Sequence, residues 1–256
     1  MRTYKRIIPL TLMIAAFMSG IVGAEQTIQT IRLSTINWEP YTGKSLPDHG
    51  FFSELVTEAF SRVSYRVEFQ YRPWARALDE AKNGDVHGVM DAYWKEDRVE
   101  FLEYPDDVWK VKEEFIALRD TSITYTGSLA DLKGSIIGVE RGGAQAEELR
   151  AADLQTAAVA DQVQNVQKLL AGRIDAILIP RAIFFYHLER LKPQFDRTLV
   201  KILKPPYKVY SLYVAFSKQK PNYAQLTADF NRGLKRIKTD GTYERVLKKH
   251  HIMSKE

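Results

Sequence analysis

Apolar residues recur along the chain with two periods, which alternate from residue 30 to the C-terminal region. Short runs rich in β-branched residues are typical of strands, and apolar residues three or four positions apart are typical of amphipathic helices. The pattern predicts strands over residues 30–36, 65–71, 86–90, 114–118, 135–139, 156–159, 174–179 and 209–216. It predicts helices over residues 51–63, 74–83, 162–171 and 222–238, a short helix over 128–134, and further helices after residues 142–145, from 181 to about 191, and after the 240–243 turn through 247.

This alternation is typical of parallel sheets with helices on their faces. Two segments, residues 84–89 and 172–177, share one pattern, in which a helix ends at a glycine and a short apolar strand follows. Two copies are too few for a solenoid, so the pattern predicts two similar α/β units. Open α/β sheets bind ligands beyond the carboxyl ends of their strands, which directs attention to the polar loop that follows residues 86–90.

Arg98 ends that loop, after the acidic residues Glu96 and Asp97. A guanidinium group can donate two parallel hydrogen bonds to a planar carboxylate, so Arg98 is a candidate for binding an anionic ligand. The alternative is a solvated surface arginine that pairs with Glu96 or Asp97.

Two further segments are candidates for ligand contact. Trp38 and Tyr41 follow the first strand and form either a stacking platform for a ligand or ordinary packing. Gly142 and Gly143 precede a helix, whose free N–H groups can bind an anion, although a plain tight turn is the commoner role of such a pair.

The N-terminus has the pattern of a secretory signal peptide. Arg2, Lys5 and Arg6 precede an apolar stretch over residues 7–17, and Val22-Gly23-Ala24 is a small-residue cleavage site. We therefore expect residues 1–24 to be removed and the protein to be periplasmic. A membrane anchor is the alternative, but the apolar stretch is short for a membrane span.

Composition narrows the function classes. The chain has 256 residues, 45% of them hydrophobic, and no cysteine, which excludes thiol catalysis and cysteine metal sites. Without the three basic residues of residues 1–24, 34 basic residues face 32 acidic ones, which gives no argument for nucleic-acid binding. The five histidines lack metal-site spacing, and we expect neither a metal nor a cofactor.

Four segments together resemble the periplasmic solute-binding proteins of family 3, the type that serves polar amino-acid ABC importers. They are Trp38-Glu39-Pro40-Tyr41, residues 77–105 with Glu96-Asp97-Arg98 and Tyr104-Pro105, residues 129–139 with 170–176, and Asp240-Gly241-Thr242-Tyr243. The resemblance implies a type II periplasmic binding protein fold, in which two α/β lobes enclose a ligand cleft and two strands form the hinge. Lobe 1 would be residues 25–109 and 211–256, lobe 2 residues 113–207, and the hinge strands would lie near 110–112 and 208–210.

The resemblance also implies site residues. Arg98 falls on the position that binds the ligand carboxylate, and Trp38 on the aromatic that covers the ligand. Asp91 and Tyr93 fall on positions that line the site, while Ala144 and Gln145 fall on the helix start that helps bind the carboxylate from lobe 2. Glu39 and Tyr41, from the same segment as Trp38, complete the expected set of site residues together with Pro180.

Pro180 is a departure from the family pattern. Many amino-acid binders have an acidic residue at this position, where it pairs with the α-ammonium group of the ligand. Since a buried unpaired charge is costly, either the ligand lacks an α-ammonium group or another acid binds it. Asp91 is the first substitute expected and Glu39 the second. The favoured ligand is a carboxylate with a ring or aliphatic body on Trp38, or a compound whose cation lies on the Asp91 side.

The predicted function is a non-catalytic, monomeric binding protein. It would capture a small polar carboxylate, an amino acid or a related compound, by lobe closure and deliver it to an inner-membrane ABC transporter permease. One alternative is a secreted enzyme similar to cyclohexadienyl dehydratase, for which Asp91, Glu39, Glu140 and His87 are the candidate acids and bases. Another is a periplasmic subunit that senses a ligand and docks on a receptor.

Overall fold

The computed structural model describes residues 28–252, so the predicted signal peptide lies outside the described residues. The strands are β1 (Gln29–Thr35), β2 (Tyr65–Tyr71), β3 (Gly88–Tyr93), β4 (Leu102–Glu103), β5 (Trp109–Leu118), β6 (Ile136–Glu140), β7 (Gln155–Val159), β8 (Ala176–Pro180), β9 (Val200–Ile202) and β10 (Lys208–Ser217). The helices are α1 (Phe51–Ser61), α2 (Trp74–Asn83), α3 (Ala144–Ala151), α4 (Gln162–Leu170), α5 (Arg181–Leu191), α6 (Tyr223–Thr239) and α7 (Thr242–Lys249). Short 3-10 helices are η1 (Pro47–His49), η2 (Glu96–Arg98), η3 (Leu129–Leu132) and η4 (Arg197–Leu199).

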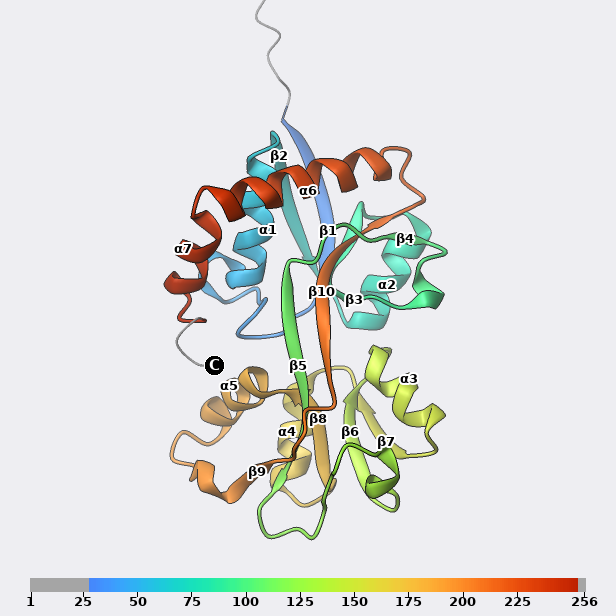
Figure 1. Cartoon of the computed structure of the whole chain (residues 1–256), viewed down its shortest axis with the longest axis vertical. Coiled ribbons are helices and arrows are strands. Elements are labelled where there is room, and N and C mark those ends of the chain that lie inside the picture. The colour runs from blue at the N-terminus through green and yellow to red at the C-terminus, as the bar shows by residue number, and fades with distance from the viewer. Residues whose placement is uncertain (1–27, 253–256) are drawn as a thin grey trace, which may run out of the picture.

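The molecule has two α/β lobes, and two long strands pass between them (Figure 1). The strands form one sheet in the order β2-β1-β3-β10-β5-β8-β6-β7, in which β5 and β10 pair antiparallel at the centre. Strands β1 to β3 with α1, α2, α6 and α7 lie at one end of the molecule, and β6 to β8 with α3 to α5 lie at the other. This arrangement confirms the predicted fold class. The exact lobe boundaries stay a prediction. Lobe 1 denotes the end of the molecule with β1 to β3, and lobe 2 denotes the end with β6 to β8.

The two passing strands are longer than the sequence pattern predicts. β5 begins at Trp109 rather than at residue 114, because residues 109–113 pair with residues 208–212 of β10. Lys110 and Lys112 interrupt the apolar pattern there. They are tolerated because antiparallel strands can present one face to water.

Local sequence accounts for several element ends. Gly84 ends α2 with a φ of 76°, a left-handed conformation that glycine adopts without strain. The carboxylate of Asp161 caps α4 by accepting a hydrogen bond from the Val163 N–H at 3.0 Å. Gly233 allows α6 to lie against α1, since a Cβ atom there would come within 2.0 Å of the Ala59 carbonyl oxygen.

Each lobe has an apolar core beneath its helices. In lobe 1 the apolar face of α6 is fully or almost fully buried against α1, through Leu226, Phe230, Leu234 and Ile237. In lobe 2 a second cluster surrounds Phe115, Ile137, Leu149 and Leu178. Among residues 28–252, no helix combines the length and the apolar character that a membrane span requires. Packing in these two cores fixes the positions of the strand ends at which the candidate site lies.

Candidate functional site

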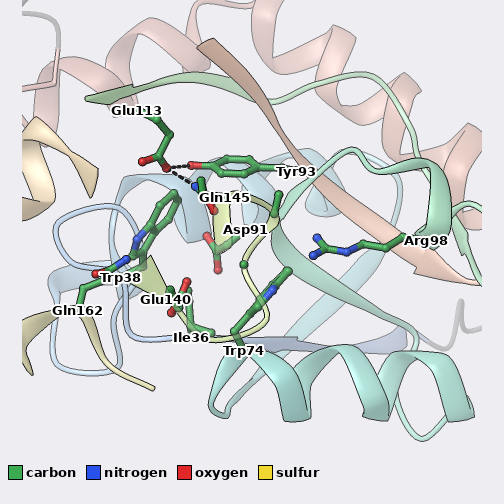
Figure 2. Close-up of a pocket in the computed structure, with 12 residues that line it drawn as sticks. Ile36, Trp38, Trp74, Asp91, Tyr93, Arg98, Glu113, Glu140, Gln145 and Gln162 are labelled. Atoms are coloured by element: carbon green, nitrogen blue, oxygen red, sulfur yellow. Dashed lines mark hydrogen bonds between the residues drawn. The ribbon is translucent and has the colours of Figure 1, made fainter. Parts of the chain in front are cut away.

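A cavity lies between the two lobes, at the strand ends that the sequence pattern indicated (Figure 2). Lobe 1 lines it with Ile36, Trp38, Trp74, Asp91, Tyr93 and Arg98. Strand β5 and lobe 2 line it with Glu113, Glu140, Gly143, Ala144, Gln145 and Gln162. Six of the nine predicted site residues are therefore brought together here: Trp38, Asp91, Tyr93, Arg98, Ala144 and Gln145.

Arg98 is buried at one side of this cavity, with 4% of its surface exposed. Its guanidinium group donates a hydrogen bond to the Gly142 carbonyl oxygen of lobe 2 at 3.1 Å and lies over the Trp74 ring at 5.4 Å from its centroid. Within residues 28–252 it forms no ion pair. Burial lowers the pKa of Arg98 below its ordinary value, but an arginine stays protonated in proteins. Arg98 is thus a buried cation rather than a surface arginine.

Asp91 lies in β3 with a φ of 59°, next to a register shift between β3 and β10. Its two carboxylate oxygens accept hydrogen bonds from the Thr35 hydroxyl at 2.5 Å and the Thr42 hydroxyl at 2.7 Å. Burial raises the pKa of Asp91 to about 6, and these hydrogen bonds oppose the rise. The carboxylate is held rigidly by lobe 1 alone.

Glu113 enters the cavity from β5 and is 1% exposed. One carboxylate oxygen accepts hydrogen bonds from the Tyr93 hydroxyl at 2.7 Å and the Gln145 amide at 2.6 Å. The other oxygen is buried and has no hydrogen-bond partner in the described part of the chain. Burial raises the pKa of Glu113 to about 7, although both hydrogen bonds favour the charged form.

Glu140 ends β6 and faces the same cavity from lobe 2. It is partly buried. Burial, followed by the negative charges of Glu113, Asp91 and Asp161, raises the pKa of Glu140 to about 8. The cavity therefore combines one arginine with three carboxyl groups whose charged forms are all disfavoured by burial.

Aromatic rings form the remaining walls. Trp38 is 5% exposed and packs edge-on against Tyr41, with centroids 5.3 Å apart, and against Tyr93 at 6.1 Å. Tyr93 stacks on Tyr210 of β10 at 4.4 Å. The indole nitrogen of Trp38 is buried without a hydrogen-bond partner among residues 28–252. Trp38 thus lines the cavity as expected, and Tyr41 packs against its ring without lining the cavity itself.

Three predicted residues lie outside the cavity lining, namely Glu39, Tyr41 and Pro180. Glu39 is partly buried, and burial raises its pKa, with Asp161 and Arg190 as its charged neighbours. Pro180 ends β8, where it is paired with Glu113 across the β5–β8 ladder. His87, a candidate base, also lies outside the lining and accepts a hydrogen bond from the Arg32 N–H at 3.1 Å.

Sequence reasoning missed Trp74, Glu113 and Gln162 as cavity residues and named Glu140 only as a possible catalytic acid. Trp74 begins α2, and its indole N–H donates to the Gly142 carbonyl oxygen at 2.9 Å. No sequence signal marks Glu113, because its role depends on the ladder with β8. Trp74 and Arg98 both reach Gly142 from lobe 1, and Lys95 pairs with Glu147 of lobe 2, so the lobes are in contact around the cavity.

A cluster of two acids and one histidine lies outside the cavity lining, on η1, on α1 and just after the end of α7. Asp48, Glu54 and His250 place ligand atoms within 4.8 Å of one another. The Lys249 ammonium already donates to Asp48 at 2.7 Å and to Glu54 at 2.8 Å. Because this ammonium group already donates to both carboxylates, the cluster gives no argument for a metal ion.

Comparison with known proteins decides the family. Residues 34–252 match the profile of the bacterial extracellular solute-binding proteins, family 3. The chain belongs to this family. The Lysine/arginine/ornithine-binding periplasmic protein of Escherichia coli (strain K12) is 24% identical over 230 residues, which cover 87% of both chains.

Two solved structures illustrate how widely this fold is used. A histidine kinase sensor domain with similarity to periplasmic binding proteins has a TM-score of 0.75 at 21% identity and covers 86% of this chain and 95% of its own. An ancestral amino acid-binding protein, described as a precursor of cyclohexadienyl dehydratase, has a TM-score of 0.70 at 19% identity, covering 86% and 94%. At these identities both structures support the fold alone.

Proposed function

We propose that this family member is a periplasmic binding protein that captures a small carboxylate-bearing ligand, an amino acid or a related compound, and passes it to an ABC importer of the inner membrane. The observation that carries the proposal is the buried Arg98 guanidinium, which lines a cavity between the lobes and has no carboxylate partner among residues 28–252. A buried charge without an ionic partner is costly. A ligand carboxylate would supply that partner.

Lobe 2 offers a second set of donors for the same carboxylate. The first N–H groups of a helix have no acceptor within the helix, and α3 begins at Ala144 on the cavity wall. A carboxylate between Arg98 and this helix start would contact both lobes at once. Since such a ligand gains contacts only when the lobes are together, its binding would favour closure. The E. coli relative, named for lysine, arginine and ornithine, supports an amino-acid-like ligand.

The test of this function is the contribution of Arg98 to binding. Thermal shift with the common L-amino acids and their deaminated acids identifies hits, and calorimetry measures them. Charge-assisted hydrogen bonds contribute about 1.5–3 kcal/mol each, so Arg98→Ala should weaken binding by roughly tenfold to a few hundredfold. Arg98→Lys should recover part of the loss, because a lysine ammonium cannot reproduce the two-pronged geometry.

The matched control is Arg173→Ala, which removes an exposed arginine outside the cavity lining and should leave the affinity unchanged. Wild-type affinity in a folded Arg98→Ala protein would contradict the proposal. Delivery to an importer is tested separately, by uptake of the radiolabelled hit in cells with and without the gene.

A secreted lyase on the same fold is the second candidate. It is favoured by Glu140, whose raised pKa of about 8 lets its carboxyl group hold a proton at neutral pH, as a general acid must. Prephenate and arogenate are the compounds to test. Turnover by the wild-type protein that is lost in Glu140→Gln would replace the binding-protein assignment, and no turnover would leave it in place.

A further inference from the structure

Trp74 begins α2 in lobe 1, and its side chain makes two different contacts at the cavity (Figure 2). Its indole N–H donates a hydrogen bond to the Gly142 carbonyl oxygen of lobe 2 at 2.9 Å. Its ring faces the Arg98 guanidinium group, whose central carbon lies 5.4 Å from the ring centroid. Arg98 in turn donates to the same Gly142 oxygen at 3.1 Å. Trp74, Arg98 and Gly142 therefore form a closed triangle of contacts, which we call the Gly142 bridge.

The backbone of Gly142 makes its carbonyl oxygen available to lobe 1. Gly142 has a φ of 74°, a left-handed conformation that glycine adopts without strain. The turn around it is closed by the Gly143 N–H, which donates to the Glu140 carbonyl oxygen at 3.2 Å. A carbonyl oxygen has two lone pairs, so the donors of Trp74 and Arg98 together saturate the Gly142 oxygen. The glycine pair before α3, which the sequence predicts as a source of N–H groups, thus also supplies an acceptor.

The Gly142 bridge explains how a buried guanidinium group is stabilised without a carboxylate from residues 28–252. Trp74 and Arg98 are each 4% exposed, and burial makes an uncompensated charge costly. The face of an indole ring attracts a cation, and a carbonyl oxygen accepts its N–H groups. Both partners are neutral, so they stabilise the positive charge of Arg98 without cancelling it. An arginine has five N–H donors, and the contact with Gly142 uses only one of its nitrogens.

The Gly142 bridge joins the lobes at a less exposed place than the ion pair beside it. Lys95 and Glu147 also connect the lobes, but their side chains are 17% and 43% exposed, so water and salt weaken the pair. Hydrogen bonds are stronger where water is excluded, as it is around the two buried side chains of the bridge. Gly142 also lies two residues before Ala144, where α3 begins. The bridge therefore fixes the position of this helix start relative to Arg98.

We propose that Trp74 is a positioning residue that joins lobe 1 to lobe 2 through the Gly142 carbonyl and holds Arg98 in place for the ligand carboxylate. The inference rests on the proposed function, in which Arg98 binds that carboxylate. The contacts of the Gly142 bridge form only when the lobes meet, so they favour the closed arrangement in addition to any contacts of the ligand. Trp74 contributes to affinity in two ways, through lobe closure and through the orientation of Arg98.

Two substitutions separate the hydrogen bond of Trp74 from its ring. Trp74→Phe keeps an aromatic face for Arg98 and removes the N–H donor, whereas Trp74→Leu removes both. Loss of one neutral hydrogen bond should shift the closure equilibrium toward the open form by about two- to tenfold. Loss of the ring should add a further factor of about two or more. The control is Trp94→Phe, since Trp94 is 53% exposed and lies outside the cavity lining.

Lobe closure can be measured with spin labels, because the chain contains no cysteine of its own. Asp79→Cys on α2 and Gln167→Cys on α4 introduce one exposed labelling site in each lobe. Double electron–electron resonance then gives the fraction of closed molecules, from zero ligand to saturation. The titrant is whichever of the common L-amino acids and their deaminated acids raises the melting temperature most. Trp74→Phe should lower the closed fraction or raise the concentration for half closure by about two- to tenfold, and Trp74→Leu should do so more strongly.

A second comparison shows whether Trp74 acts through Arg98. The same titrations are repeated with Arg98→Ala in every protein. The difference between Trp74→Leu and Trp74→Phe should then disappear, because no guanidinium group remains over the ring. The loss caused by Trp74→Phe should persist, because its hydrogen bond to Gly142 is separate. A packing defect alone would keep Trp74→Leu more harmful than Trp74→Phe in both backgrounds. Circular dichroism confirms folding, and Trp74→Phe alone decides the hydrogen bond if Trp74→Leu is unfolded.

The outcomes separate this inference from the proposed function. If Trp74→Phe and wild type close alike at every ligand concentration while Arg98→Ala loses affinity, the Gly142 bridge is wrong and the carboxylate site stands. A wild-type protein with no closed fraction at any concentration would also overturn the bridge. If Trp74→Leu and Trp74→Phe still differ in the Arg98→Ala background, the positioning of Arg98 by Trp74 is wrong. If the Trp74 variants open the lobes as expected but Arg98→Ala keeps wild-type affinity, the bridge holds and the carboxylate site falls.

Discussion

Glu113 and Glu114 are neighbours on β5, but they lie in opposite electrostatic surroundings. Glu114 accepts two hydrogen bonds from Arg181, at 2.8 and 3.1 Å, and one from Lys204 at 2.8 Å. Burial alone would raise the pKa of Glu114, but these partners outweigh burial and hold it below its ordinary value. Glu113 has only neutral partners, and burial raises its pKa to about 7.

The difference shows how one strand can serve stability and binding at once. Successive side chains of a strand point to opposite faces, so Glu114 faces α5 while Glu113 faces the cavity. On the α5 side the protein supplies its own cations, and the charge is balanced without a ligand. On the cavity side Arg98 is present, but no lysine, arginine or histidine among residues 28–252 forms an ion pair with Glu113.

The largest expected effect is a pH dependence of binding. In the unliganded protein Glu140 and Glu113 carry pKa values raised to about 8 and about 7, so a bound cation must displace protons from them. A single carboxyl with a pKa near 8 makes the affinity for an amino compound rise by on the order of 50-fold between pH 6 and pH 8. Calorimetry in buffers of different ionisation enthalpy should show net proton release.

This dependence rests on the raised pKa of Glu140. Burial is its main cause, followed by the negative charges of Glu113, Asp91 and Asp161. Glu140→Gln should flatten the dependence, whereas Glu114→Gln should leave it unchanged, because the pKa of Glu114 is already low. An affinity that stays constant from pH 6 to pH 8 would show that neither Glu113 nor Glu140 loses a proton when the ligand binds.

The comparison of the two glutamates also shows what sequence can predict here. Periodicity was sufficient for the helices and most strands, and a loop ending in Arg98 was sufficient to locate one wall of the cavity. The sequence could not identify Glu113 as a cavity residue, because the run Lys-Val-Lys-Glu-Glu at residues 110–114 is typical of a polar strand edge. Only the pairing of β5 with both β10 and β8 shows which of its two glutamates faces the ligand cleft.

The second expected effect is on stability. Glu114→Gln leaves Arg181 and Lys204 without their shared carboxylate, and it should lower the free energy of unfolding by about 1–3 kcal/mol. The loss stays below that of a fully buried pair, because the two cationic side chains are 46% and 61% exposed. Glu113→Gln removes no ion pair, and because burial raises the pKa of Glu113 to about 7, its charged form lowers stability at pH 7. This variant should therefore be at least as stable as wild type at pH 7. Urea denaturation at pH 7 measures both, and equal losses would remove the distinction between the two faces.

The third effect is the pH dependence of stability without ligand. The folded protein binds more protons at Glu140 than the unfolded chain does between pH 4.5 and about 8, so this group lowers stability as pH rises through that range. Glu140→Gln should therefore be more stable than wild type at pH 8, by up to about 4 kcal/mol, and close to it at pH 4.5. Glu114, with a lowered pKa, has the opposite sign, because its stabilisation is present at neutral pH and is lost as pH falls. Denaturation at a series of pH values tests both signs.

The smallest expected effect concerns the ion pair between the lobes. Lys95 of lobe 1 and Glu147 of lobe 2 pair outside the cavity lining, with side chains that are 17% and 43% exposed. Exposed pairs contribute about 0.2–1 kcal/mol, so Glu147→Gln should weaken ligand binding by less than about fivefold, and added salt should reduce the difference further. Calorimetry at low and high ionic strength, with small-angle scattering of the unliganded protein, measures affinity and lobe opening together. The expected outcome is a slightly more open unliganded protein with nearly unchanged affinity, since the residues that line the cavity are unchanged. A loss as large as that expected for Arg98→Ala would instead mean that this ion pair between the lobes, rather than charge in the cavity, governs binding.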